Sequence, residues 1–359
     1  MVCVLTKNLG RVLKIDSQMQ KIIANVLFVV SAGSEFGLGH FRRMASVANS
    51  FKKIQPTIRV SFYLVGWDQG DFEFLHAAHP HWNFVALKHE DFEKKYKFSI
   101  YDIVLFDLHE THITNGIFNL TSQLTKNLQI VVAIDHLALI PEVFTTLRWV
   151  PSFYLELDNL DDLEIFYGWD CYLLEKKLPT ILQPFKNRIL ILTGGSDVAC
   201  YGDVWPELFN KRIACPLEIH WVRGPFSKSP KLPSVTKHKY VIHESPNGID
   251  EIINCCDFVL SVYGVSVFEA LMYSRDCIIY SENSKNEFEI NLLNELDCID
   301  VAVNGNQLIK ILNQKIDTSS IRYEKIKFSN PLIDGYGSMR LVDIIFEKFK
   351  MNRLDSELL

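Results

Sequence analysis

The chain has 359 residues, of which 48% are hydrophobic and 22% charged, and its formal net charge is −6 at pH 7. This composition excludes a disordered chain, and the acidic balance argues against a protein held on nucleic acid by phosphate contacts. The length exceeds what one hydrophobic core usually spans, so we expect two domains.

The first 33 residues allow two interpretations. Basic residues precede the apolar stretch 22–32, as they would in a targeting signal. The stretch runs directly into a glycine-rich turn, which favours the first strand of a fold instead. No other run is long enough to cross a membrane. We therefore expect a cytoplasmic protein with an N-terminal extension at 1–24.

The first half of the chain alternates apolar runs with stretches of helical spacing. Asn25–Ser31 predicts a buried strand, 34–43 form a glycine-rich turn, and 44–51 have the spacing of a helix. Further elements follow in order, with strands at Arg59–Val65, Asp102–Asp107, Leu128–His136 and Leu147–Tyr154 and a short helix at Phe72–Ala78. Prolines and a loss of periodicity then predict a domain crossing near 176–187.

The second half repeats this alternation, again with a glycine turn after its first strand. We predict strands at Arg188–Thr193, Ile219–Val222, Lys239–Ile242, Asp257–Val262 and Cys277–Tyr280. We predict helices at Ile249–Cys255, Val267–Tyr273, Leu292–Glu295, Gly305–Gln314 and Ser338–Lys350. This pattern indicates an α/β protein with two doubly wound, Rossmann-like domains that face each other across a cleft.

The same pattern gives domain boundaries. We assign 25–180 to the N-terminal domain, 181–335 to the C-terminal domain, and 336–359 to a C-terminal helix that packs back on the first domain.

The eight cysteines show no spacing typical of a zinc site. None forms a C-x-x-C pair, and Cys255 and Cys256 are adjacent. Such cysteines are typical of reduced, mostly buried thiols in a cytoplasmic protein, so we expect no metal.

Three polar residues follow strands of the first half. His40 lies in the turn Gly37-Leu38-Gly39-His40, and Asp107 and Asp135 follow two later apolar runs. Because parallel strands bind ligands beyond their carboxyl ends, we expect these side chains to converge on one rim. A histidine in such a place suits general base catalysis, since imidazole titrates near neutral pH. Each residue also has a structural alternative, because a strand-end Asp is often a helix N-cap.

The ordered set of motifs carries a family resemblance. The motifs are Gly37-x-Gly39-His40-x-x-Arg43, Tyr172-x-Leu174, Gly194-Gly195-Ser196-Asp197, Glu269-Ala270, Asn283, and Asp334-Gly335-x-Gly337-x-x-Arg340. Over roughly residues 25–350 this order resembles the UDP-sugar hydrolases of the pseudaminic acid pathway, often called PseG. That family has the two-domain GT-B fold of many glycosyltransferases. The resemblance implies that the first domain carries the sugar and the chemistry and that the second binds the nucleotide.

The resemblance implies a reaction. The family removes UDP from a 2,4-diacetamido-2,4,6-trideoxy hexose and releases the free sugar for nonulosonic acid synthesis, without a cofactor or a metal. By this resemblance His40 is the general base that activates a water, and Arg43 faces the sugar or the closing helix. The expected partner is therefore a small UDP-sugar, with no nucleic acid and no integral membrane segment.

Together with the strand ends described above, the resemblance implies a set of substrate-binding residues. The full set is Gly37, Gly39, Arg43, Asp107, Asp135, Gly195, Ser196, Gly264, Ser266, Glu269 and Asn283. Gly264 and Ser266 bring N–H groups to the diphosphate at a helix N-terminus. Glu269 accepts hydrogen bonds from the ribose hydroxyls, and its alternative is an exposed acid on a helix surface.

Some positions depart from the family pattern. The family commonly carries Arg-x-Asp at the end of its first strand, where this chain has Val29-Val30-Ser31-Ala32. The usual Asn-Gln pair is Asn283-Ser284, and a doubled Asp is Asp135-His136. These changes keep two alternatives open. One is an inverting GT-B glycosyltransferase, in which an acceptor hydroxyl replaces water, and the other is a non-catalytic nucleotide-sugar-binding protein.

Overall fold

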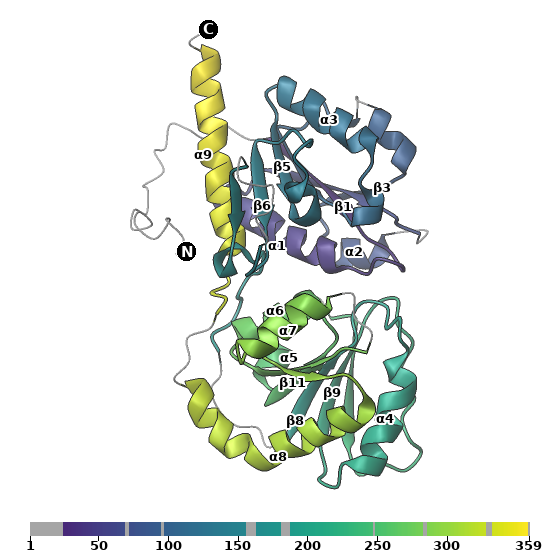
Figure 1. Cartoon of the computed structure of the whole chain (residues 1–359). Helices are drawn as coiled ribbons and strands as arrows, with labels where there is room; N and C mark the ends of the chain where they lie inside the picture. Colours follow the sequence, from purple (N-terminus) through teal and green to yellow (C-terminus); the bar gives the residue numbers. More distant parts are fainter. Residues whose placement is uncertain are drawn as a thin grey trace.

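The computed structural model describes residues 24–68, 72–94, 97–155, 163–180, 187–246, 248–282, 286–327 and 332–357. Within these ranges two β-sheets, each flanked by helices, form two bodies that lie one above the other in Figure 1. This confirms the predicted α/β class with two doubly wound domains.

The first sheet has seven strands in the order β3-β2-β1-β4-β5-β6-β7, all parallel. Its strands are β1 Asn25–Ser31, β2 Arg59–Val65, β3 Asn83–Leu87, β4 Ile103–Asp107, β5 Ile130–Ile134, β6 Leu147–Val150 and β7 Ile165–Tyr167. Its helices are α1 Gly39–Ile54, α2 Glu73–Ala78 and α3 Asn115–Lys126, with short 3-10 turns η2 His89–Glu93, η4 Glu110–His112, η5 Asp135–Leu139 and η6 Trp169–Cys171.

The second sheet has six parallel strands in the order β10-β9-β8-β11-β12-β13. Its strands are β8 Arg188–Leu192, β9 Glu218–Arg223, β10 Lys239–Glu244, β11 Phe258–Ser261, β12 Asp276–Tyr280 and β13 Asp300–Ala302. Its helices are α4 Tyr201–Arg212, α5 Asp250–Asn254, α6 Val265–Met272, α7 Glu287–Glu295 and α8 Gly305–Lys327.

Both sheets have a switch point in their strand order between two central strands. In the first sheet the strand order reverses between β1 and β4, and in the second between β8 and β11. In doubly wound sheets ligands bind beyond the carboxyl ends of the strands at this switch. The strands there are buried on both faces, because hydrophobic clusters cover each side of each sheet.

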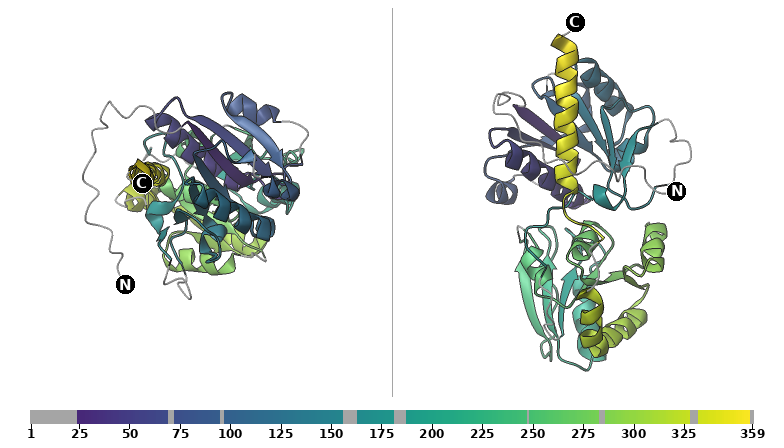
Figure 2. Two further views of the ribbon diagram at one scale, coloured as in Figure 1. Left: turned by 90° about the horizontal axis from the view of Figure 1, so that it is seen from above. Right: turned by 90° about the vertical axis from the view of Figure 1, so that its left-hand side faces the viewer.

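The last helix, α9 Gly337–Glu357, runs along the first domain, as the yellow helix in Figures 1 and 2 shows. Leu341, Val342 and Ile345 are fully buried in the core that α1 also covers. The hydroxyl of Ser338 lies 2.8 Å from that of Ser46 on α1. The chain therefore leaves the first domain once and returns to it at its end. Among the described residues, no helix has the length and apolar character needed to cross a membrane.

The structure also contains elements that the sequence analysis missed, namely β3, β7, β13, α3 and α4. The strand β3 alternates irregularly between buried and exposed positions, and α4 contains an internal Pro206, which disfavours a helix prediction. The predicted strand Leu128–His136 ends at Ile134, so Asp135 opens the 3-10 turn η5 instead of ending the strand.

Candidate active site

Four predicted site residues meet at the carboxyl edge of the first sheet, near the β1–β4 switch. The His40 Nδ1 atom lies 2.8 Å from Asp107 Oδ1. Arg43 donates from Nε and Nη2 to the two oxygens of Asp107, and from Nη2 to Asp135 Oδ2 at 2.7 Å. His40 and Arg43 are three residues apart on α1, so the helix presents both on one face.

Charge holds this cluster together. Burial alone would raise the pKa of Asp107, but the Arg43 guanidinium and the neighbouring imidazole outweigh it, and the pKa lies well below its ordinary range. Burial likewise opposes the charge of Arg43, yet Asp107 and Asp135 raise the pKa of the guanidinium above its ordinary value. Asp107 is therefore an ionised carboxylate although its side chain is completely buried.

The ionised Asp107 decides the tautomer of His40. A carboxylate only accepts hydrogen bonds, so the His40 Nδ1–H group donates to it. The 3.0 Å approach of Arg43 Nη2 to the same nitrogen is then a close contact and not a hydrogen bond. In the neutral imidazole the lone pair is left on Nε2. A buried carboxylate that orients a histidine in this way is the arrangement found in acid–base catalysis.

Ser31 has a structural partner at the position where the family pattern predicts charge. Its hydroxyl accepts a hydrogen bond from the backbone N–H of His109 at 2.8 Å and lies 2.7 Å from His112 Nδ1. The His112 ring packs on Phe36, with 4.3 Å between the ring centroids. Ser31 is fully buried, so it supports the loops around the rim and does not face a ligand.

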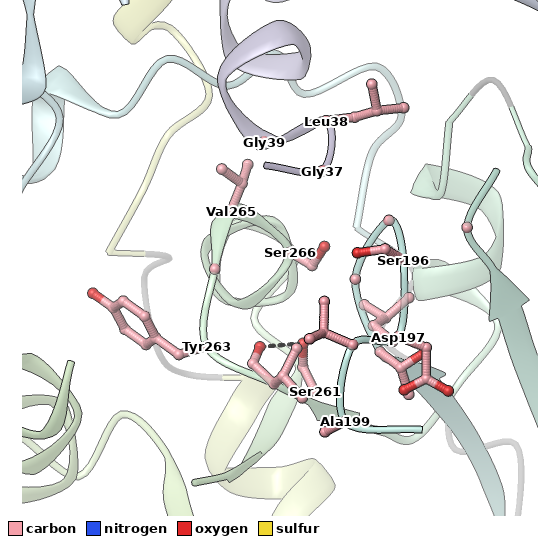
Figure 3. A pocket seen from close by; sticks show the side chains of 18 of the residues that line it. Gly37, Leu38, Gly39, Ser196, Asp197, Ala199, Ser261, Tyr263, Val265 and Ser266 are labelled. Atoms are coloured by element: carbon pink, nitrogen blue, oxygen red, sulfur yellow. Dashed lines mark hydrogen bonds between the residues drawn. The ribbon is translucent and has the colours of Figure 1, made fainter. Parts of the chain in front are cut away.

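A cleft of about 450 Å³ lies between the two domains (Figure 3). Such a volume falls within the roughly 300–1,000 Å³ of ordinary ligand sites. Its first-domain wall is the turn 35–39 together with Arg42, and its second-domain walls include 192–199, 261–266 and 280–282. Predicted residues that line the cleft are Gly37, Gly39, Gly195, Ser196, Gly264 and Ser266.

The other predicted residues lie elsewhere. His40, Arg43, Asp107, Asp135 and Glu269 are not among the residues that line the cleft, although their neighbours Gly39, Arg42 and Ser266 are. Asn283 lies outside the residues that the structure describes. The catalytic candidates and the cleft are therefore neighbouring sites, joined by the start of α1.

The glycine turns of the two domains touch across the cleft. A Cβ atom on Gly195 would lie 3.5 Å from the Cα of Gly37 and from the backbone nitrogen of Leu38. Gly224, after β9, supports this turn from behind, because a Cβ there would overlap the carbonyl group of Gly195. The sequence analysis missed Gly224, and the Gly-Pro pair that it forms with Pro225 was the available turn signal.

The helix α6 begins at the cleft, opposite the Gly37–Gly39 turn, and Figure 3 shows Ser266 and Ser196 on either side of the space beneath that turn. The first N–H groups of a helix have no intrahelical partner, and the positive end of its dipole favours an anion. The carboxylate of Asp197 accepts hydrogen bonds from the backbone N–H groups of Tyr201 and Gly202, so it caps the start of α4.

Glu269 lies one turn into α6 and is not an exposed acid. Its Oε2 atom is buried and has no hydrogen-bond partner within the described part of the chain. Burial raises the pKa of Glu269, and the positive charges of Arg42 and Lys177 only partly oppose this effect. A buried oxygen without a partner is costly unless a ligand supplies a donor.

No protein-family model matches the chain. It is 21% identical over 351 residues to the spore coat polysaccharide biosynthesis protein SpsG of Bacillus subtilis (strain 168), an alignment that covers 89% of this chain and 96% of that protein.

Solved structures with a similar fold include proteins crystallised with UDP compounds. The S. aureus MnaA–UDP structure has a TM-score of 0.59 at 14% identity, covering 92% of this chain and 97% of that one. The UDP-GlcNAc 2-epimerase of Neisseria meningitidis bound to UDP-GlcNAc has a TM-score of 0.57 at 14% identity, covering 90% and 100%. The MurG protein of Acinetobacter baumannii has a TM-score of 0.55 at 11% identity, covering 90% and 99%. The chain has the two-domain, glycosyltransferase-like GT-B fold.

Proposed function

We propose that this protein hydrolyses a UDP-linked amino or deoxy sugar and releases UDP and the free sugar, with His40 as the general base. The observation that carries the proposal is the orientation of His40, whose Nδ1–H is held by the buried carboxylate of Asp107. This leaves Nε2 as the proton acceptor, at the start of α1 and beside Gly39 and Arg42, which line the cleft.

The UDP part of the substrate suits the second-domain side of the cleft. The diphosphate would accept hydrogen bonds from the N–H groups at the start of α6 and approach the turn at Gly195 and Ser196. The unpartnered Oε2 of Glu269 would accept from the ribose hydroxyls. The similar structures that hold UDP or UDP-GlcNAc support a nucleotide sugar as the ligand.

The sugar would extend from the diphosphate toward His40, where Arg43, Asp107 and Asp135 hold the rim rigid. A water between His40 and the anomeric carbon transfers its proton to Nε2 while its oxygen attacks that carbon. The bond from the anomeric carbon to the diphosphate oxygen breaks, and the helix N-terminus stabilises the charge on the departing UDP. The free sugar would then enter nonulosonic acid synthesis of the pseudaminic type, as the motif resemblance implies.

The test is UDP release from candidate UDP-linked amino and deoxy sugars, first without and then with acceptor alcohols. We expect release without any acceptor, and we expect His40→Ala to lower kcat by about 10²–10⁴-fold while UDP still binds in calorimetry. His81→Ala, at an exposed histidine, is the matched control and should leave kcat unchanged. Full activity of His40→Ala would rule out this mechanism for any substrate.

An inverting glycosyltransferase is the second candidate. It is favoured by Ser31, which is bound to His109 and His112 at the place where the hydrolase pattern carries charged residues. The similarity to a polysaccharide biosynthesis protein points the same way. UDP release that depends strictly on an acceptor would establish it in place of the hydrolase. UDP binding without turnover on any sugar would instead indicate a non-catalytic binding protein.

A further inference from the structure

A group of histidine and cysteine side chains lies in the C-terminal domain, on the face of the second sheet that α5 covers. In β9, Ile219 and Trp221 pack into the core on the opposite face. Because side chains alternate along a strand, His220 and Val222 face α5, and Val222 shares a core with Ile252 and Ile253 of that helix.

His243 joins this face from the neighbouring strand. In β10, Tyr240 and Ile242 pack with the opposite core, so His243 faces the same side as His220. The strands β9 and β10 pair in parallel, with His220 opposite Val241 and Val222 opposite His243. The two imidazoles are consequently close, with 3.0 Å between His220 Nδ1 and His243 Nε2.

The end of α5 brings two thiols to these histidines. Cys255 is the C-cap residue of α5, and Cys256 follows it. One ligand atom from each of His220, Cys255 and Cys256 lies within 4.8 Å of the other two. His220 is 8% exposed and Cys256 is fully buried, so the group is largely shielded from water.

A carboxylate orients His220 from its far side. Glu218 Oε1 lies 3.0 Å from His220 Nε2, and Glu218 is itself paired with Arg188 and Lys239. The carboxylate accepts from Nε2–H, so in the neutral ring the lone pair is on Nδ1, facing His243. Histidines that bind a metal almost always donate their other N–H in this manner.

We propose that His220, Cys255 and Cys256 bind a zinc ion as its three protein ligands. Two thiolates and an imidazole form a donor set that suits zinc and does not suit Mg²⁺ or Ca²⁺. The adjacent cysteines gave no metal signal in the sequence, because His220 comes from a strand earlier in the chain.

The site has a structural role, since it lies in the domain opposite His40. It joins β9 to the connection between α5 and β11. Its ligand His220 lies two residues before Val222, which lines the cleft. Binding requires both thiols to lose their protons, and these are released to solvent as the metal enters.

Cobalt substitution of the full-length protein tests the site, because tetrahedral Co²⁺–thiolate centres show intense near-ultraviolet charge-transfer absorption. We expect one Co²⁺ per chain, displaced by Zn²⁺, and loss of the absorption in the Cys255→Ser/Cys256→Ser variant. Cys298→Ser is the matched control, since Cys298 is a half-buried cysteine of the same domain outside the group. Glu218→Ala should weaken cobalt binding about 10–100-fold.

The proposal is overturned if the wild-type protein shows no charge-transfer absorption and carries no stoichiometric zinc by mass spectrometry. It is equally overturned if Cys298→Ser removes the absorption as fully as the double variant does. Circular dichroism checks the folding of each variant. If the double cysteine variant does not fold, His220→Asn must lose the absorption while its circular dichroism is retained, and an unchanged spectrum contradicts the assignment.

Discussion

At the scale of single residues, the proposed base depends on Asp107, which touches both His40 and Arg43. In Asp107→Asn the amide can present either an acceptor or a donor to Nδ1, so the tautomer is no longer fixed. We expect kcat for UDP release to fall by about 10²–10⁴-fold with a much smaller change in KM. Asp135→Asn is the comparison, because Asp135 contacts Arg43 but has no recorded bond to His40. Equal losses in the two variants would contradict the positioning role of Asp107.

Asp107 also gives the protein a predictable response to acid. Its pKa in the folded state is depressed, so its stabilising contribution is complete above the ordinary aspartate pKa of about 3.9 and is lost as the pH falls through the lower value. At neutral pH, the loss of this buried ion pair in Asp107→Asn should lower the free energy of unfolding by about 3–5 kcal/mol. The difference in melting temperature between the wild type and Asp107→Asn should become smaller below about pH 4. A difference that stays constant into strong acid would show that the carboxylate does not carry this stability.

The convergence of His40, Asp107 and Asp135 was predictable, because strands of one parallel sheet end on the same edge. The sequence did not predict that Arg43 would join them, although its spacing of three residues from His40 on a helix was a usable signal. The contact of Ser31 with His112 could not be predicted from the sequence, because the two residues lie 81 positions apart. Glu269 could not be classified from sequence, since its burial depends on how α6 packs.

At the scale of elements, the turn 194–196 is supported by the packing of one backbone on another. A side chain at Gly224 would overlap the Gly195 carbonyl, so Gly224→Ala must displace the turn. We expect a loss of about 1–3 kcal/mol in stability and weaker UDP binding in calorimetry. Gly116→Ala in α3 is the control, because a Cβ there makes only ordinary contacts with Thr114 and Phe92, and Ala favours a helix. Unchanged UDP affinity in Gly224→Ala would separate this turn from the ligand site.

The elements that could be predicted are those with a continuous buried run. All but the first residue of β1 are buried, and the strands at the centre of each sheet were located within a few residues. The elements that were missed lie mainly at sheet edges or on the surface. The edge strand β13 has only three residues, and α4 carries a proline inside its helical span. Their structure is imposed by the neighbours they pack on, which the local sequence does not contain.

For the whole molecule, an aromatic contact joins the domains beside the cleft. Phe226, which follows β9, packs against Trp67 and Phe74 of the first domain, with ring centroids 6.1 and 6.2 Å apart. Each such pair contributes about 0.5–1.5 kcal/mol. Phe226→Ala should therefore increase the radius of gyration of the ligand-free protein in small-angle X-ray scattering, and UDP should reduce the difference. Phe144→Ala, at an exposed phenylalanine of the first domain, should leave the scattering unchanged. A Phe226→Ala curve identical to that of the wild type would show that other contacts set the domain arrangement.

The return of the chain along α9 has a mechanical consequence. The two passages between the domains run side by side, because a side chain at Gly335 would overlap Lys176 and one at Gly337 would overlap the carbonyl of Tyr172. Two parallel tethers permit one body to swing about their common line, but sliding or twisting would stretch at least one of them. We therefore expect product to leave by a swing of one domain. Spectroscopic labels placed on the first-domain wall and on the second-domain wall of the cleft should then show a changing distance between them. A pair of labels with one on each of the two adjoining chain passages should keep a constant distance. A change in that distance would refute a swing about this line.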